Sequence, residues 1–432
     1  MSAAPPPTSV MSALAPVAAL LVSVALLLMG NGLQGALLPL RAEIDAQTAI
    51  EIGILGSSYF LGFGIGCLSA ARFVQRAGHI RVFAAAVALA STTALVHALI
   101  SEPAIWWLLR GTTGFCFAIL YTVIESWLNE KATSENRGAI FSVYTVINLT
   151  VLTLGQLMLL LGDPAQFPLF AVASILVSLS AIPLALSTSE APAPIQSAKI
   201  NLKKLYRQSP VGAAGVLAVG LANGSFWALA PIFAAGRADA ASPAAAVAIF
   251  MSVVVVGGAI GQWPIGLLSD RMDRRRVLIM TALGAIAAAL CMLLVADRVP
   301  HGVFIFGFFY GVFGFPINAI ATAHMNDHTE PSGFVETASG LLLLYGIGAV
   351  IGPIMASIII SFTNLDALFG WILAVQTVLV LFTLYRVTRR EAVADEDQGS
   401  FASALIAAQT TSPITASSGP RRRGTETGAP SD

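Results

Sequence analysis

The sequence predicts an all-α membrane protein. Its twelve transmembrane helices are expected to form two pseudo-symmetric six-helix bundles, with both termini in the cytoplasm. The composition, the spacing of the apolar stretches and an internal repeat support this prediction. Of the 432 residues, 56% are hydrophobic and only 11% are charged. A soluble protein with so few charged residues could not cover that much apolar surface.

Twelve apolar stretches follow one another along the chain, and most are close to the roughly 20 residues that span a hydrocarbon core. Each must be helical, because lipid offers no hydrogen-bond partner to an open backbone. The predicted spans are residues 14–40, 50–71, 82–100, 104–128, 138–161, 167–186, 211–235, 244–268, 277–296, 303–323, 337–362 and 368–386.

A ten-residue pattern recurs in the first and seventh spans. Asn31–Leu40 and Asn223–Ile232 both read N-G-x-x-x-A-L-x-P followed by an apolar residue, 192 positions apart. A duplicated six-helix half is a common plan for secondary transporters, which hold their substrate between the halves. The predicted domains are an N-terminal bundle at 1–186, a cytoplasmic linker at 187–210, a C-terminal bundle at 211–386 and a disordered cytoplasmic tail at 387–432.

The repeat also predicts how the two halves are related. They should superpose by rotation about an axis normal to the membrane, pairing Asn31 with Asn223 and Pro39 with Pro231. Because proline cannot donate to the preceding turn, Pro39 and Pro231 should bend or end their helices near the outer face.

The basic residues predict the orientation. Of 23 lysines and arginines, 19 fall in the tail and in the loops on one side, three fall in the loops on the other side, and Arg110 alone lies inside a span. The side rich in basic residues is the cytoplasmic side. Residues 1–10 carry no basic residue, so we expect the first span to be a retained anchor rather than a cleaved signal peptide.

Features of an enzyme or a metal protein are not evident in the sequence. Cys67, Cys116 and Cys291 fall within spans and read as small core residues. The histidines show no metal-ligand spacing, and the external loops are short. We therefore predict no catalytic residue, no metal and no cofactor, and no nucleic-acid partner. A polytopic membrane sensor or enzyme remains as a remote alternative.

Arg110 lies on a helix face that continues through Gly114, Ala118, Tyr121 and Glu125. A charge facing lipid costs roughly 3 kcal/mol or more, so this face should border a wet cavity. The alternative is that Arg110 reaches the outer surface, which is about six residues away, by extending its side chain.

The loop after the eighth span carries the most specific motif. Gly266–Arg276 reads GLLSDRMDRRR and resembles the major facilitator superfamily signature G-x-x-x-D-R-x-G-R-R, with Asp273 where the family has glycine. The resemblance implies a cytoplasmic gate between the halves, and a carboxylate–guanidinium pair that breaks in one conformation suits that role. The equivalent loop at Ala71–Arg81 has Gln75 in place of the acid. The predicted gating residues are Asp270, Arg271, Arg274, Glu125 and Arg76.

Three further stretches resemble the YcaD-like group of bacterial major facilitators. They are Glu125–Asn129, Asn136–Gly138 and the Leu344–Pro353 segment of span eleven. In sugar porters of this superfamily a Glu-Ser pair also closes span four, so Glu125 is expected to pair with Arg72 or Arg76.

The resemblance to the superfamily also implies that spans one, four, seven and ten line a substrate cavity. The polar and aromatic residues on these spans are costly to leave in lipid without a partner. The predicted substrate-binding residues are Arg110, Asn31, Gln34, Tyr121, Asn223, Trp227, Tyr310 and Asn318. For Asn31 and Asn223 the alternative is that they hydrogen-bond between helices and only hold them together.

Spans one, seven and ten contain no acidic residue at depth, so the cavity's one firm charge is positive. This favours a neutral or anionic small-molecule substrate. Proton coupling needs a titratable group in the pathway, and Glu125 and Glu51 are the candidates left.

We predict a transporter of the bacterial inner (plasma) membrane, embedded in the lipid bilayer and functional as a monomer. The alternative function is drug or metabolite efflux: Gly348–Pro353 resembles a drug-antiporter pattern, but that pattern belongs in span five, where this chain has Gly155-Gln156.

Overall fold

The structure is a computed structural model that describes residues 17–133, 136–186, 201–237, 239–330, 333–389 and 398–410. Every regular element in these ranges is helical, and twelve segments are long and apolar enough to cross a membrane, as predicted. Nine of these spans are the single helices α2 (Ala18–Ile44), α3 (Ala49–Ala77), α4 (His79–Leu99), α5 (Pro103–Lys131), α10 (Pro210–Arg237), α11 (Pro243–Ser269), α12 (Arg274–Leu294), α15 (Phe334–Phe362) and α16 (Ala367–Val387). Three are composite: α6 (Arg137–Leu157) with η2 (Met158–Leu161), α7 (Pro168–Leu179) with α8 (Ala181–Ala185), and α13 (Gly302–Gly314) with α14 (Pro316–Asn326).

Local sequence explains where several helices begin. Thr48 and Glu51 form a capping box at the start of α3, in which each side chain accepts a hydrogen bond from the other residue's backbone N–H. Ser242 caps α11 and is followed by Pro243, which suits the first helical position. These caps satisfy backbone donors that have no partner within the helix. Glu51, a candidate for proton coupling, is thus engaged in a helix cap.

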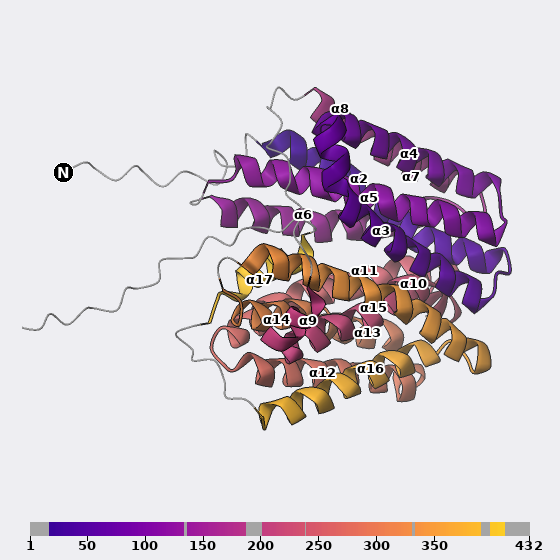
Figure 1. The fold of residues 1–432 in the computed structure, drawn as a ribbon. Coiled ribbons are helices and arrows are strands. Elements are labelled where there is room, and N and C mark those ends of the chain that lie inside the picture. The colour runs from indigo at the N-terminus through magenta and orange to yellow at the C-terminus, as the bar shows by residue number, and fades with distance from the viewer. Residues whose placement is uncertain are drawn as a thin grey trace, which may run out of the picture.

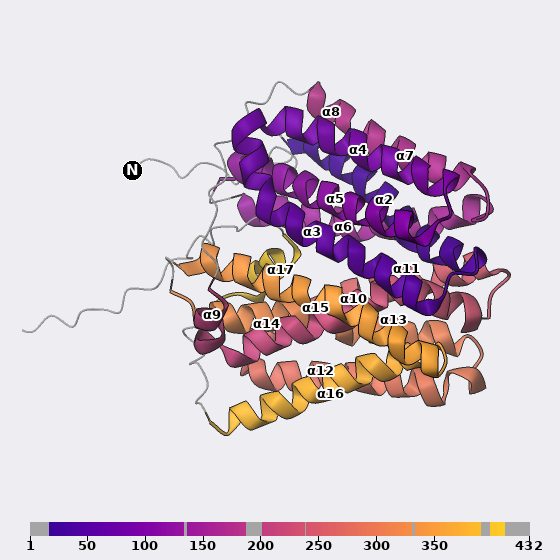
Figure 2. The same cartoon turned by 45° about the vertical axis from the view of Figure 1, so that its right-hand side comes forward.

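Two groups of helices stand side by side in Figures 1 and 2. Helices α2 to α8 form the indigo-to-magenta group, and α10 to α16 form most of the other group. We call the end of the bundle where α2 begins and α16 finishes the terminal end, and the opposite end the far end. That the two halves superpose by rotation about an axis normal to the membrane stays a prediction.

The repeated Asn-Gly pair shows how each group is built. A Cβ at Gly32 of α2 would clash with the backbone of Leu152 in α6, and a Cβ at Gly224 of α10 would clash with the backbone of Ala349 in α15. Glycine therefore permits these two helix pairs to approach at backbone distance. Pro39 and Pro231 both lie inside their helices, within the last two turns, so they do not end them.

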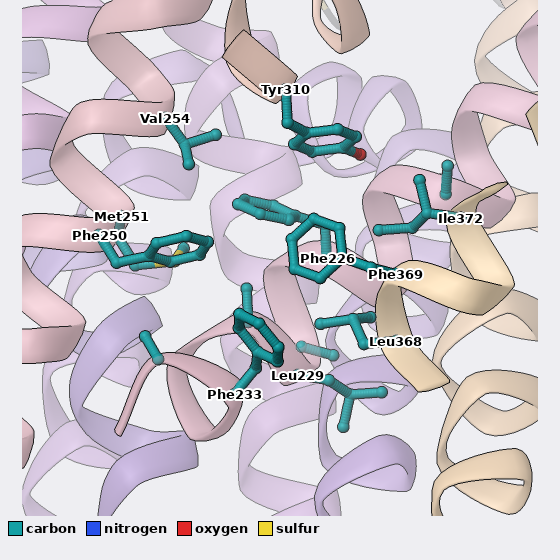
Figure 3. Packing of buried hydrophobic residues seen from close by; sticks show 14 of the residues in the cluster. Phe226, Leu229, Phe233, Phe250, Met251, Val254, Tyr310, Leu368, Phe369 and Ile372 are labelled. Carbon is teal, nitrogen blue, oxygen red and sulfur yellow. The ribbon is translucent and has the colours of Figure 1, made fainter. Parts of the chain in front are cut away.

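An aromatic cluster forms the core of the second group (Figure 3). The ring centroid of Phe226 lies 5.4 Å from that of Tyr310, which lies 5.6 Å from that of Phe369. All three side chains are fully buried. Such pairs contribute roughly 0.5–1.5 kcal/mol each beyond their burial, so this core holds α10, α13 and α16 in place.

The tail departs from the prediction of disorder. Within 387–432, residues 401–409 form a helix, α17 (Phe401–Gln409), which Ser400 caps through Ser403 N–H. Figures 1 and 2 show it at the terminal end, between the two groups. Of the predicted linker, residues 187–200 lie outside the described residues, and Leu202–Gln208 form the short helix α9. Disorder is predicted for the tail and not for the linker. Within the tail, α17 differs from that prediction because its apolar residues pack against the bundle, and residues 390–397 and 411–432 lie outside the described residues.

Candidate functional site

A cavity of about 450 Å³ lies between the two helix groups. Its walls come from α2, α3, α5, α6, α10, α11, α14, α15 and α17, so both groups and the C-terminal segment contribute. Of the eight predicted substrate-binding residues, six line it. They are Asn31, Arg110, Tyr121, Asn223, Trp227 and Asn318.

Arg110 carries the formal charge in the cavity wall. Its guanidinium carbon lies 4.4 Å from the ring centroid of Tyr59, an arrangement that attracts the cation to the aromatic face. Its Nη1 is buried and has no hydrogen-bond partner. The side chain thus borders the cavity, and the alternative that it extends to the outer surface does not describe this structure. One guanidinium donor remains free to bind an acceptor placed in the cavity.

The rest of the wall combines aromatic rings with carboxamides, and among the described lining residues none is acidic. The rings are those of Tyr59, Phe60, Phe63, Tyr121, Trp227, Phe315 and Tyr345. The carboxamides are those of Asn31, Asn148, Gln156, Asn223, Gln262, Asn318, Asn326 and Gln409. Apolar faces with a few convergent polar groups are typical of small-molecule sites.

The two asparagines of the repeat occupy similar settings. Asn31 is a hydrogen-bonding neighbour of Tyr59 and Tyr121, and Asn223 is one of Tyr345. In each repeat the glycine that follows makes the close helix contact, and the asparagine faces the cavity. The close packing alone therefore does not account for the asparagines.

Two predicted residues do not line the cavity. Gln34 is fully buried and neither of its side-chain polar atoms has a partner, and Tyr310 lies in the aromatic core with an unpartnered hydroxyl. Helix geometry explains both positions. At 100° per residue, Gln34 is about 60° away from Asn31 around its helix, and Tyr310 about 80° away from Asn318. In addition, the tenth span is interrupted between Gly314 and Pro316.

Sequence reasoning missed the residues of spans two and eleven. Tyr59 and Phe63 of α3 and Tyr345 of α15 line the cavity although the family resemblance pointed only to spans one, four, seven and ten. A signal was present in part, since Tyr59 follows Ser57 and Ser58 in an otherwise apolar span. Nothing in the sequence indicated that Gln409 from the tail would reach the same cavity.

The far end of the molecule is tightly closed. Ser57 donates a hydrogen bond to the carbonyl of Val350 (2.7 Å), which joins α3 to α15 across the two groups. A Cβ at Gly53 would clash with Ser357 and Pro353, and one at Gly56 would clash with Ala228. The two groups therefore meet at backbone distance on this side.

At the terminal end, the predicted gate residues hold the C-terminal segment. Arg274 is almost fully buried: its Nε donates to Asp327 Oδ2 (2.5 Å), its Nη1 to Ser269 (3.0 Å) and its Nη2 to the carbonyl of Gly399. Burial raises the pKa of Asp327, and the charge of Arg274 opposes that effect.

Asp270 takes part in the same contacts. Its Oδ1 accepts a hydrogen bond from the N–H of Phe401 (2.7 Å) and lies 3.7 Å from Arg274. Arg271 is exposed. The guanidinium near Asp270 is thus that of Arg274, four residues further along and across the loop between α11 and α12, because the side chain of Arg274 is buried in the bundle.

The remaining gate residues lie elsewhere. Glu125 is fully buried and accepts a hydrogen bond from Tyr144 (3.3 Å), whereas Arg76 is exposed on the last turn of α3 and takes no part in that contact. Asp273 caps α12 through Arg275 N–H (3.0 Å) and pairs with the guanidinium of Arg275 (2.8 Å).

Comparison with known proteins gives a consistent picture. The sequence profile of the Major Facilitator Superfamily matches residues 20–344 and 243–421. The uncharacterized MFS-type transporter YcaD of Salmonella typhi is 26% identical over 374 residues, covering 86% of this chain and 96% of that protein.

Among solved structures, the nucleoside transporter NupG has a TM-score of 0.70 at 14% identity and covers 91% of this chain and 99% of its own. A bacterial homologue of the human lysosomal transporter Spinster, inward-facing and unoccupied, has a TM-score of 0.65 at 16% identity over 91% of this chain and 96% of its own. The E. coli fucose:proton symporter FucP, in the outward conformation, reaches 0.56 at 15% identity, with 87% and 99% covered.

Proposed function

Because the chain belongs to the Major Facilitator Superfamily, we propose that it is a secondary transporter that moves a small organic solute through the cavity between its two halves. The observation that carries the proposal is a cavity of about 450 Å³ with walls from both helix groups and a free guanidinium donor. The cavity is complete within one chain, so the transporter functions as a monomer. The chain is a multi-pass protein of the bacterial inner membrane.

The transport mechanism is alternating access. The close contacts of Gly53, Gly56 and Ser57 with the other half seal the far end, while the cavity extends to Asn326 and Ala338 near the terminal end. With the basic loops in the cytoplasm, this conformation faces inward. Rocking of the two halves about the cavity opens the far end and closes the terminal end.

The substrate class we propose is a small planar solute with one negative charge. Arg110 has no carboxylate near it in the described cavity wall, and a buried guanidinium without a counter-ion is costly. An anionic group on the solute supplies that counter-ion and accepts from Nη1. The rings of Tyr59, Trp227 and Tyr345 give flat apolar surface to the rest of the molecule.

For proton coupling we propose Glu125 as the titrating group. It is buried one turn beyond Tyr121, which lines the cavity, and it accepts a hydrogen bond from Tyr144. Glu51 is already engaged in the cap of α3. Efflux of cationic drugs is the alternative function for a protein of this fold. The positive charge of Arg110 disfavours it, because that charge repels a cation in the cavity.

A matched panel of probes tests the substrate class. Benzoate, benzamide and benzylamine share one ring and differ in charge, so their effect on the thermal unfolding of purified protein reports the charge preference. We expect benzoate to raise the melting temperature most and benzylamine least. Arg110→Ala should weaken benzoate binding by about tenfold or more, since hydrogen bonds to charged groups contribute ~1.5–3 kcal/mol.

Arg110→Lys is the informative companion variant. It keeps the charge but loses the planar fork, so we expect normal expression and weakened anion binding. A larger shift with benzylamine, or full benzoate binding in Arg110→Ala, would contradict the proposed substrate class and favour cation efflux.

A further inference from the structure

The C-terminal segment at residues 398–410 lies outside the twelve spans, yet its last residues form part of the cavity wall. Ala407, Ala408, Gln409 and Thr410 all line the cavity. Asn318 donates to the carbonyl of Ala408 (3.3 Å), so a residue of the predicted binding set is already occupied by the segment.

The segment is held by the signature loop. Three residues of that motif contact it: Asp270 accepts from the N–H of Phe401, Arg274 donates to the carbonyl of Gly399, and Gly266 leaves room for the Phe401 ring, because a Cβ there would clash with it. Asp327 adds a hydrogen bond from the N–H of Gly399 (2.9 Å). The two backbone N–H groups and the carbonyl at the start of α17 are thus bound by charged side chains, which make the stronger hydrogen bonds.

The apolar face of α17 joins the two halves. Phe401 and Ala404 are buried. Leu405 packs against the apolar core that contains most of the buried residues of the second group. Ile406 packs against the core of the first group, and α17 contacts α6 of that group as well as α11 and α14 of the other. The helix therefore sits between the halves at the terminal end, where they must approach each other in the opposite conformation.

We propose that residues 398–410 form an autoinhibitory plug. Docked on Asp270, Arg274 and Asp327, the plug covers the terminal end of the cavity and stabilises the conformation that is closed at the far end. It leaves before a solute passes this end and before the halves close there. This goes beyond the proposed transport function, and it requires only the cavity, not a particular substrate.

Cys67 supplies a probe that needs no substrate. It lines the cavity in α3 and is half-buried, whereas the other cysteines can be removed as Cys116→Ala and Cys291→Ala. Displacing the plug should expose Cys67 to a membrane-impermeant maleimide added to purified protein. The rate of Cys67 alkylation therefore measures how often the plug is undocked.

Two alanines of α17 provide a matched pair of variants. Ala404 is 2% exposed and faces the bundle, while Ala402 on the same helix is exposed. Ala404→Glu places a carboxylate in an apolar contact and should expel the plug, raising the alkylation rate of Cys67 by about tenfold. Ala402→Glu adds the same charge to solvent and should leave the rate unchanged.

Deleting residues 398–432 gives an independent test if Ala404→Glu fails to fold. The truncated protein should show the same increase in Cys67 alkylation with a melting temperature close to that of the full chain. Equal alkylation rates in the full chain, Ala404→Glu and the truncated protein would overturn the plug. Because none of these measurements involves transport, a failure here leaves the proposed function standing, and a failure of anion binding leaves the plug standing.

Discussion

Single polar and aromatic residues within the spans can have quite different roles. Arg110 and Tyr59 face the cavity, and their cation–π contact leaves a guanidinium donor free. Tyr310 was predicted to bind substrate by its place on span ten, but its ring is fixed in the aromatic core between Phe226 and Phe369. Aromatic packing, and not solute contact, accounts for Tyr310.

Tyr310→Phe tests this assignment. Its hydroxyl is buried without a partner, so removing it relieves an unsatisfied polar group. We expect the free energy of unfolding to stay unchanged or rise by up to about 1 kcal/mol, with anion binding unaffected. Thermal unfolding with and without benzoate provides both readouts. A loss of benzoate binding would show instead that Tyr310 contributes to the substrate site.

Among the elements, the helices that follow α3 and α11 begin after different residues. Gly78 precedes α4 with a left-handed φ of 81°, whereas Asp273 precedes α12 with a φ of −51° and caps it. The aspartate that departs from the family signature is therefore a helix cap. Burial alone would raise the pKa of Asp273, but its hydrogen bonds and ion pair with Arg275 outweigh that effect and lower the pKa below its ordinary value of 3.8.

Asp273→Gly restores the family residue and should nevertheless destabilise the protein. It removes the cap of α12, which costs only a few tenths of a kcal/mol when glycine replaces the cap, and the pair with Arg275, so the free energy of unfolding should fall by roughly 0.5–1 kcal/mol in total. Because the folded-state pKa is depressed, this stabilisation is present above pH 3.8 and is lost as the pH falls through the lower folded-state pKa. Melting temperatures of both proteins at neutral pH and in acid should converge as the pH falls. A difference that persists in acid would contradict this role.

In the whole molecule, the two ends of the bundle differ in what occupies them. Helix packing seals the far end, through Gly53, Gly56 and Ser57, while α17 occupies the terminal end. Backbone contacts of this kind depend on a missing Cβ, so one methyl group should be enough to shift the balance between conformations.

Gly53→Ala should open the far end. The added Cβ clashes with Ser357 and Pro353, whereas Gly64→Ala on the same helix meets no atom within 4 Å and serves as the control. Leu161 and Phe362 are both exposed and lie at the far end. Spin labels attached at Leu161→Cys and Phe362→Cys report the distance between the halves by double electron–electron resonance. We expect a population with a longer distance in Gly53→Ala alone. Identical distance distributions in both variants would show that the Gly53 contact does not control the closure.

Much of this protein follows from its sequence. Twelve apolar stretches in a lipid environment require twelve helices, and the repeated pattern at Asn31 and Asn223 marks two helices that both reach the cavity. A lone arginine in a span indicates a cavity, because a charge that faces lipid is costly. These inferences succeed because hydrophobicity and helical period act locally and can be read along the chain.

The tertiary structure decided what depends on contacts between distant segments. It excluded Gln34 and Tyr310 from the cavity, added Tyr59 and Tyr345, and placed α17 against the signature loop. A helix face spans a wide angle, so periodicity does not separate a cavity residue from a core residue 60–80° around the same helix. Nor does a short apolar stretch within a polar tail reveal its partner, because the surface that buries it is built by α6, α11 and α14, which are distant from it along the chain.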